Sequence, residues 1–219
     1  MDPTKKREYF RSLMNKNKCY HPGSVFDPIS ARIAEDLGFE IGMFAGSIAS
    51  MTVLGAPDLI VLTLSEFCEQ AHRVCRASGL ALLVDADHGY GNALSVKRTV
   101  EELETAGVSA LTIEDTRLPK TYSNEKTTAL LSLEEGVGKM KAALEGRSDN
   151  SLIITARTSA FSVTNDEDAL VRAKAYEAAG VDALFFAGIS TRAQIELLNA
   201  SISIPIFIAP KGNEIMDLN

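Results

Sequence analysis

The chain has 219 residues, of which 46% are hydrophobic and 23% charged, and its formal net charge is −7. These values are typical of a globular domain with a substantial core, and the acidic balance argues against sequence-independent nucleic-acid binding. Residues 1–7 lack the apolar segment of a signal peptide, and no apolar run is long enough to cross a bilayer, so we expect a cytoplasmic protein with no membrane partner.

Short apolar runs alternate with amphipathic segments along the whole chain. This alternation predicts βα units and a parallel sheet. The expected strands cover residues 24–26, 41–45, 80–84, 110–113, 152–156, 183–187 and 204–208. The expected helices between them centre on residues 30–37, 66–77, 94–106, 133–145, 167–179 and 191–199.

A weak internal repeat indicates how these units are arranged. In residues 104–111 and 177–184 a helix ends, a glycine follows and a strand begins. Such repeats without a Rossmann glycine fingerprint favour a TIM-type (β/α)₈ barrel over a doubly wound sheet. Barrels of this kind typically need about 250 residues. We therefore expect one incomplete β/α-barrel domain over 1–219, C-terminally truncated after about seven strands, or a sheet that stays open.

Carboxylates follow two of the expected strands at the point where each strand ends. Asp85 and Asp87 follow the apolar residues 80–84, and Glu114 follows 110–113. Because chemistry in barrels lies at the carboxyl ends of the strands, these side chains are expected to converge. Their oxygens suit a hard divalent cation, most simply Mg²⁺, with open positions for a substrate. The alternative is that they only cap the following helices or lie in solvated loops.

Three further residues lie near strand ends. Ser47 follows the second strand, where its hydroxyl and nearby backbone N–H groups suit a carboxylate or form an ordinary turn. Arg157 closes the fifth strand, and its planar guanidinium suits a substrate carboxylate or an ion pair with one of the acids. Asp58 is either a turn residue or a further carboxylate that acts on the cation through water.

Five segments resemble the isocitrate lyase/phosphoenolpyruvate mutase superfamily, and within it the oxaloacetate decarboxylase family. They are residues 21–32, 46–50, 85–92, 112–115 and 156–158, among which the Asp-x-Asp-x-Gly-Tyr-Gly run is the most specific. The resemblance implies a lyase that decarboxylates oxaloacetate, or a 3-substituted analogue, to pyruvate and CO₂ through a metal-stabilised enolate. It also implies a homo-oligomer, which is a tetramer in the family.

The resemblance gives each candidate residue a role. Asp85 would ligate Mg²⁺ directly, with Mn²⁺ as a substitute, and Ser47 and Arg157 would bind the small-molecule 2-oxo acid. The remaining carboxylates would hold water molecules on the metal: Asp58, Asp87 and Glu114.

The chain departs from the superfamily pattern after the fourth strand. Lyases of the superfamily carry a Lys-Lys/Arg-Cys-Gly-His run there, whereas residues 119–124 read Pro-Lys-Thr-Tyr-Ser-Asn and contain no thiol. This difference counts against isocitrate or methylisocitrate cleavage, and Tyr122, with an unperturbed pKa near 10, is a poor base. Residues 119–131 are polar enough for a lid over the site or for a plain surface loop.

Other departures concern the end of the chain. Lys211 stands where the decarboxylases have a tyrosine, and their substrate-binding histidine would lie beyond Asn219. His21 and His88 do not stand where that histidine would, and we expect them to support the site or to pack, with a catalytic role as the alternative. Two alternatives therefore stand beside the decarboxylase: a carbon–carbon lyase on a 2-methylmalate-like substrate, and an inactive truncated remnant that binds a 2-oxo acid.

Overall fold

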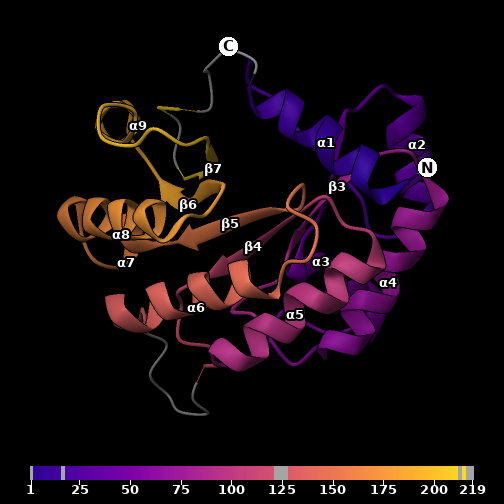
Figure 1. Ribbon diagram of the computed structural model, residues 1–219, viewed down its shortest axis with the longest axis horizontal. Coiled ribbons are helices and arrows are strands. Elements are labelled where there is room, and N and C mark those ends of the chain that lie inside the picture. The colour runs from indigo at the N-terminus through magenta and orange to yellow at the C-terminus, as the bar shows by residue number, and fades with distance from the viewer. Residues whose placement is uncertain (1, 16–17, 121–127, 212–213, 216–219) are drawn as a thin grey trace.

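Seven parallel strands form one curled sheet in which each strand pairs with its neighbour in the chain. The computed structural model describes residues 2–15, 18–120, 128–211 and 214–215. Figure 1 shows the strands fanning around a common axis as in an incomplete barrel, so the expected fold class is confirmed. The strands are β1 (Gly23–Ser24), β2 (Ile41–Phe44), β3 (Ala81–Asp85), β4 (Ala110–Glu114), β5 (Ile153–Thr158), β6 (Ala183–Ile189) and β7 (Ile206–Pro210). Within the described ranges, β1 and β7 are the edges of the sheet.

Helices follow one another around the outside of the sheet (Figure 1). All six expected helices are present, with ends shifted by a few residues: α2 (Pro28–Asp36), α4 (Leu64–Ala77), α5 (Ala93–Ala106), α6 (Leu133–Gly146), α8 (Asp166–Ala179) and α9 (Arg192–Asn199). The sequence analysis missed four further elements: α1 (Pro3–Met14), α3 (Gly46–Ala49), the π-helix η1 (Ser50–Leu54) and α7 (Ala160–Val163). None of the helices in the described residues is long and apolar enough to span a bilayer.

Local signals explain where the outer helices begin and end. Thr63 and Glu66 form a reciprocal capping box at the start of α4, which satisfies backbone N–H groups that the helix leaves free. Gly107 and Gly180 end α5 and α8 with φ values of 94° and 98°. This left-handed conformation is accessible to glycine at little cost, and it turns the chain back toward the next strand.

The two faces of the sheet are covered differently. The outer face packs against the helices through the larger apolar cluster, which includes Leu82, Leu111 and Ile154. At the amino ends of the strands, the inner face packs against α1 through a second cluster that includes Phe10 and Leu13. Because α1 covers the amino ends, the carboxyl ends are the end of the sheet where a site can lie.

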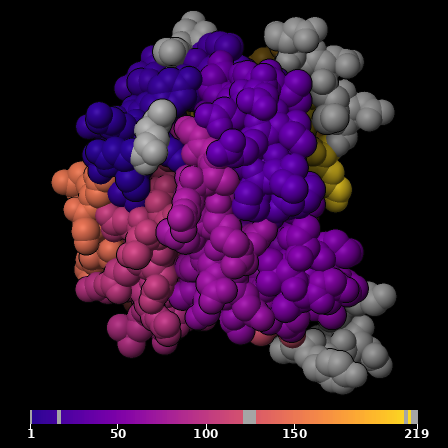
Figure 2. All heavy atoms as spheres, turned by 90° about the vertical axis from the view of Figure 1, so that its right-hand side faces the viewer, coloured from indigo at the N-terminus to yellow at the C-terminus, as the bar shows by residue number. Residues whose placement is uncertain are grey.

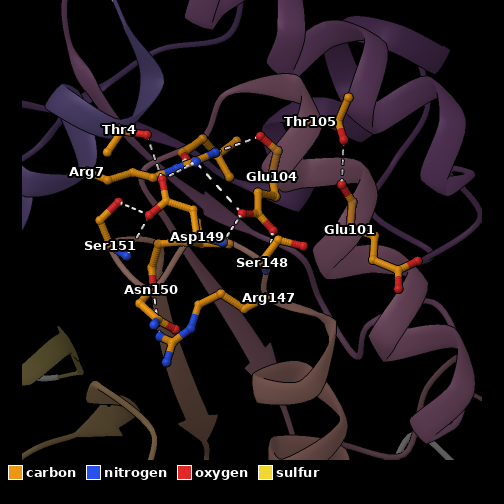
Figure 3. A network of polar contacts seen from close by, with 12 residues as sticks. Thr4, Arg7, Glu101, Glu104, Thr105, Arg147, Ser148, Asp149, Asn150 and Ser151 are labelled. Atoms are coloured by element: carbon orange, nitrogen blue, oxygen red, sulfur yellow. Dashed lines mark hydrogen bonds and ion pairs between the residues drawn. The ribbon is translucent and has the colours of Figure 1, made fainter.

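Polar contacts hold α1 in place. Arg7, almost fully buried, donates from Nε to the carbonyl of Val108 at 2.9 Å and from one Nη to the carbonyl of Glu104 at 2.6 Å. Its other Nη and the Thr4 hydroxyl each lie 2.8 Å from Oδ2 of Asp149 (Figure 3). These contacts satisfy carbonyls at and just after the end of α5, and they explain why Arg7 is buried.

Candidate active site

Three charged side chains meet on the inner face at the carboxyl ends of the strands. Asp85 pairs in register with Thr112, and Glu114, two residues beyond Thr112, pairs with Arg157. Alternate residues of a strand face the same side, so Asp85, Glu114 and Arg157 share one face. The expectation that the two carboxylate-bearing strand ends converge agrees with this geometry.

Arg157 contacts both carboxylates. Its Nη1 donates a hydrogen bond to Oδ2 of Asp85, and its Nε lies 3.3 Å from Oε2 of Glu114. Its guanidinium carbon also lies 5.5 Å from the ring centroid of Phe185, which is a cation–π distance. Burial lowers the pKa of Arg157, but Asp85 and Glu114 raise it more, so the group stays charged. The ion pair with the acids, one of the two readings of this arginine, is therefore present.

Asp87 lies beside this cluster in a tight turn. Its φ is 47°, in the left-handed region, and its carbonyl accepts a hydrogen bond from the Glu114 N–H at 2.8 Å. Burial and the nearby charges of Asp85, Glu114 and Asp58 raise the pKa of Asp87 to about 8. Burial also raises the pKa of Glu114, against the opposing effect of Arg157. The site therefore gathers more carboxyl groups than Arg157 alone can neutralise, so ionisation of Asp87 is unfavourable without a further positive charge.

The start of α3 approaches Asp87 closely. A Cβ atom on Gly46 would lie 2.6 Å from Oδ1 of Asp87, so only glycine fits there without displacement. Ser47, the next residue, is exposed beside this contact. Asp58 is also exposed, in the loop after η1, and its negative charge contributes to the raised pKa of Asp87.

The donor set fits a hard divalent cation. All the acidic groups offer oxygen atoms, and their mutual repulsion at Asp87 is of the kind that a divalent cation relieves. Among the described residues, no three histidine, cysteine or acidic side chains stand in the arrangement of direct metal ligands. That is compatible with Mg²⁺, which usually keeps several waters and takes only one or two direct carboxylates.

Two buried residues that the sequence analysis missed support the acidic turn. Thr112 donates from its hydroxyl to Oδ1 of Asp85 at 2.9 Å. Lys139 on α6, only 3% exposed, donates to the carbonyl of His88 at 2.7 Å. The position of Thr112, two residues before Glu114 in a strand, could have indicated its orientation. A lysine on an amphipathic helix carries no such signal.

The remaining expectations concern the segment 119–131, the two histidines and Lys211. At the two ends of the segment expected to be a lid or a plain surface loop, the N–H of Arg117 donates to the carbonyl of Ala129 and the N–H of Leu131 donates to the carbonyl of Asp115, each at 2.8 Å. Residues 121–127, including Tyr122, lie outside the described residues. His21 and Lys211 are exposed, and His88 is buried, where burial and Lys139 lower its pKa to about 4.

A curled parallel sheet with an acidic cluster at the carboxyl ends of its strands defines a β/α-barrel enzyme of the kind that binds ligands at that end. The phosphoenolpyruvate phosphomutase family model matches residues 10–219, and the chain belongs to this family.

Named relatives agree with this assignment. An oxaloacetate decarboxylase of Rhodopseudomonas palustris (strain BisB18) is 56% identical over 212 residues, which cover 97% of this chain and 73% of the relative. A structure of oxaloacetate acetylhydrolase with 3,3-difluorooxalacetate superposes with a TM-score of 0.86 at 26% identity, over 95% of this chain and 72% of that one. A structure of phosphonopyruvate hydrolase with oxalate and Mg²⁺ superposes with a TM-score of 0.83 at 27% sequence identity, over 95% of this chain and 72% of that one. The expected resemblance and enzyme class are thus confirmed.

Proposed function

We propose that this chain decarboxylates oxaloacetate, or a close 3-substituted analogue, to pyruvate and CO₂ with Mg²⁺ as cofactor. The observation that carries the proposal is the meeting of Asp85, Asp87 and Glu114 with Arg157 at one end of the sheet. The names of the relatives at 52–58% identity support oxaloacetate as the substrate. The Mg²⁺ complex of phosphonopyruvate hydrolase supports the cofactor.

The carboxylates would hold the cation and the water molecules around it. Asp85 is the proposed direct ligand, because it ends β3 with its carboxylate on the inner face and Thr112 fixes one of its oxygens. Asp58, Asp87 and Glu114 would bind water molecules of its hydration shell. When bound, the cation supplies Lewis-acid chemistry at the 2-oxo group of the substrate.

Arg157 and Ser47 would bind the substrate. The guanidinium of Arg157 can engage a carboxylate through parallel hydrogen bonds. Ser47 is exposed and directly follows Gly46, which approaches Asp87 closely. When the bond between C3 and the distal carboxylate breaks, its electron pair moves toward the 2-oxo group and CO₂ leaves. A proton then adds at C3. The reaction needs no strong base in the bond-breaking step, in keeping with the lack of a thiol in residues 119–124.

The test is CO₂ release from oxaloacetate by this 219-residue chain, with Mg²⁺ and with a chelator, corrected for decarboxylation by the metal alone. We expect metal-dependent turnover above that background, with pyruvate as the other product. Two carbon fragments in place of CO₂ and pyruvate would identify the carbon–carbon lyase. Absence of turnover from a folded chain that binds oxalate would identify a binding protein.

We also propose that the protein forms homo-oligomers. Ile29 and Ile33 on α2, with Leu37 at its C-cap, follow one another at four-residue spacing, and they are 69%, 54% and 72% exposed. Apolar stripes of this kind usually mark contact surfaces. Figure 2 shows the side of the molecule on which α2 lies in Figure 1, and the first half of the chain forms most of that surface. The molar mass from light scattering tests the proposal: a mass of 23.6 kDa would contradict it.

A further inference from the structure

A buried polar cluster lies on the outer side of β4, directly behind the candidate site. Asp115 follows Glu114, and its side chain points away from the site, toward α8. Its Oδ2 accepts hydrogen bonds from the Tyr176 hydroxyl at 2.6 Å and from Nη1 of Arg172 at 3.0 Å. Asp115 and Tyr176 are 0% exposed and Arg172 is 7% exposed. None of these three residues has a role in the chemistry proposed above.

The surrounding residues accommodate this cluster. Arg172 and Tyr176 are four residues apart on α8 and so project from the same face of the helix. Oδ2 of Asp168 accepts from Nε of Arg172 at 2.9 Å and so orients the guanidinium. A Cβ atom on Gly136 would lie 2.4 Å from the Tyr176 hydroxyl, so the glycine leaves the space that this hydroxyl occupies. A buried carboxylate is costly unless it is paired and hydrogen-bonded. Here Oδ2 is both paired and hydrogen-bonded, whereas Oδ1 is buried without a hydrogen-bond partner among the described residues, so the carboxylate depends on Arg172 and Tyr176.

The backbone beside this cluster is tied to the candidate site. The N–H of Asp115 donates to the carbonyl of Arg157 at 3.1 Å, and the N–H of Glu114 donates to the carbonyl of Asp87 at 2.8 Å. The carbonyl of Asp115 accepts from the N–H of Leu131. A displacement of Asp115 would therefore move the backbone of Glu114, the acidic residue next to it in the chain.

We propose that Asp115, held by Arg172 and Tyr176, is a positioning residue for Glu114. Glu114 faces the site from the last position of β4, and the outward side chain of Asp115 anchors that strand end to α8. The inference rests on the proposed function, because it assigns Glu114 a place beside the cation. It extends the functional unit beyond the residues that face the substrate to a helix on the outside of the sheet.

Tyr176→Phe tests this role by removing one hydroxyl from the cluster. We expect the variant to fold and to lose about tenfold in kcat/KM on oxaloacetate, since small displacements of reacting groups are costly. Thr4→Val is the matched control, because it removes a hydroxyl that donates to a carboxylate at the opposite end of the sheet (Figure 3). A folded Tyr176→Phe with the kcat/KM of the control would overturn the proposal. If Tyr176→Phe fails to fold, Asp115→Asn takes its place under the same criteria.

A double-mutant cycle on Mn²⁺ binding separates positioning from general stability. Calorimetry with Mn²⁺ alone gives dissociation constants for the wild type, Tyr176→Phe, Glu114→Ala and the double variant. We expect Tyr176→Phe to weaken binding when Glu114 is present and to have no further effect when Glu114 is absent. Equal effects in both backgrounds, or none in either, would overturn the proposal.

The same series distinguishes this inference from the proposed function. A wild type that binds Mn²⁺ without turnover of oxaloacetate contradicts the proposed reaction, while the binding cycle still decides the role of Asp115. A wild type that neither binds Mn²⁺ nor turns over oxaloacetate contradicts both.

Discussion

Arg157 on β5 donates a hydrogen bond to Asp85 on β3, across the intervening strand β4. Their side chains are only 21% and 13% exposed, so the two charges are partly removed from water. Removal of either residue leaves the other charge without its partner, and this costs more than the loss of a surface ion pair. Arg157, the proposed partner of a substrate carboxylate, and Asp85, the proposed ligand of the cation, are therefore energetically linked.

Replacement of Arg157 by alanine should chiefly weaken substrate binding. Loss of a charged hydrogen-bonding partner from a buried pair typically costs about 2–5 kcal/mol, which corresponds to at least roughly 30-fold in affinity. We expect KM for oxaloacetate to rise by about that factor. Arg157→Lys keeps the charge but loses the planar fork, so its KM should lie between those of wild type and alanine variant. An unchanged KM in Arg157→Ala would exclude this arginine from substrate binding.

Replacement of Asp85 by alanine should abolish Mg²⁺-stimulated turnover, because the proposed direct ligand is lost. Calorimetry with Mn²⁺ should show a loss of binding in the same variant. Glu145→Ala is the control, since Glu145 is an exposed carboxylate near the end of α6, which leads back to the amino ends of the strands. If Asp85→Ala retained Mg²⁺-stimulated activity, Asp85 would be removed from the cation site.

Replacement of Gly46 by alanine should displace the carboxylate of Asp87, because the new Cβ would lie 2.6 Å from its Oδ1. We expect kcat/KM to fall by about tenfold or more with little change in the circular dichroism spectrum. Gly138→Ala is the matched control, because a Cβ at that position on α6 meets no atom within 4 Å. Equal activities for the two variants would show that the close approach of Gly46 to Asp87 has no functional weight.

Asp149 should make the stability of the protein depend on pH in the acid range. Burial tends to raise its pKa, but hydrogen bonds from Ser151, Arg7 and Thr4 outweigh this effect and lower it. A carboxyl group with a lowered folded-state pKa stabilises the protein above its unfolded pKa of about 4. That contribution is lost as the pH falls through the lower folded-state value.

Urea unfolding of the wild type and Asp149→Asn at several pH values measures this contribution. At pH 7 we expect the variant to be less stable by about 2 kcal/mol, the order of a charged hydrogen-bonded contact. The difference in unfolding free energy should narrow below pH 4, because Asp149 then becomes protonated in the unfolded chain while it stays ionised in the folded protein. If the free energies of unfolding of the two proteins differed by the same amount at pH 3 and pH 7, the lowered pKa of Asp149 would not be a source of the pH dependence.

The repeating pattern of strands and helices was predictable because it depends on local signals. Apolar runs, capping residues such as Thr63 and glycines such as Gly107 act within a few residues of their own positions. The helix α1 was missed because its buried face includes Lys6 and Arg7. Their burial depends on backbone carbonyls more than 60 residues away in the chain, which no local pattern reveals.

The sequence by itself determined the parallel βα architecture and the acidic strand ends that carry Asp85, Asp87 and Glu114. Because the strands were expected to be parallel, these groups were expected at one end of the sheet, and the motif they belong to indicated the family. Only the tertiary structure decided their partners: Arg157 with Asp85 and Glu114, Gly46 against Asp87, and Tyr176 with Asp115. The physical reason is that such contacts join segments dozens of residues apart, so they follow from the curl and register of the whole sheet rather than from neighbouring residues in the chain.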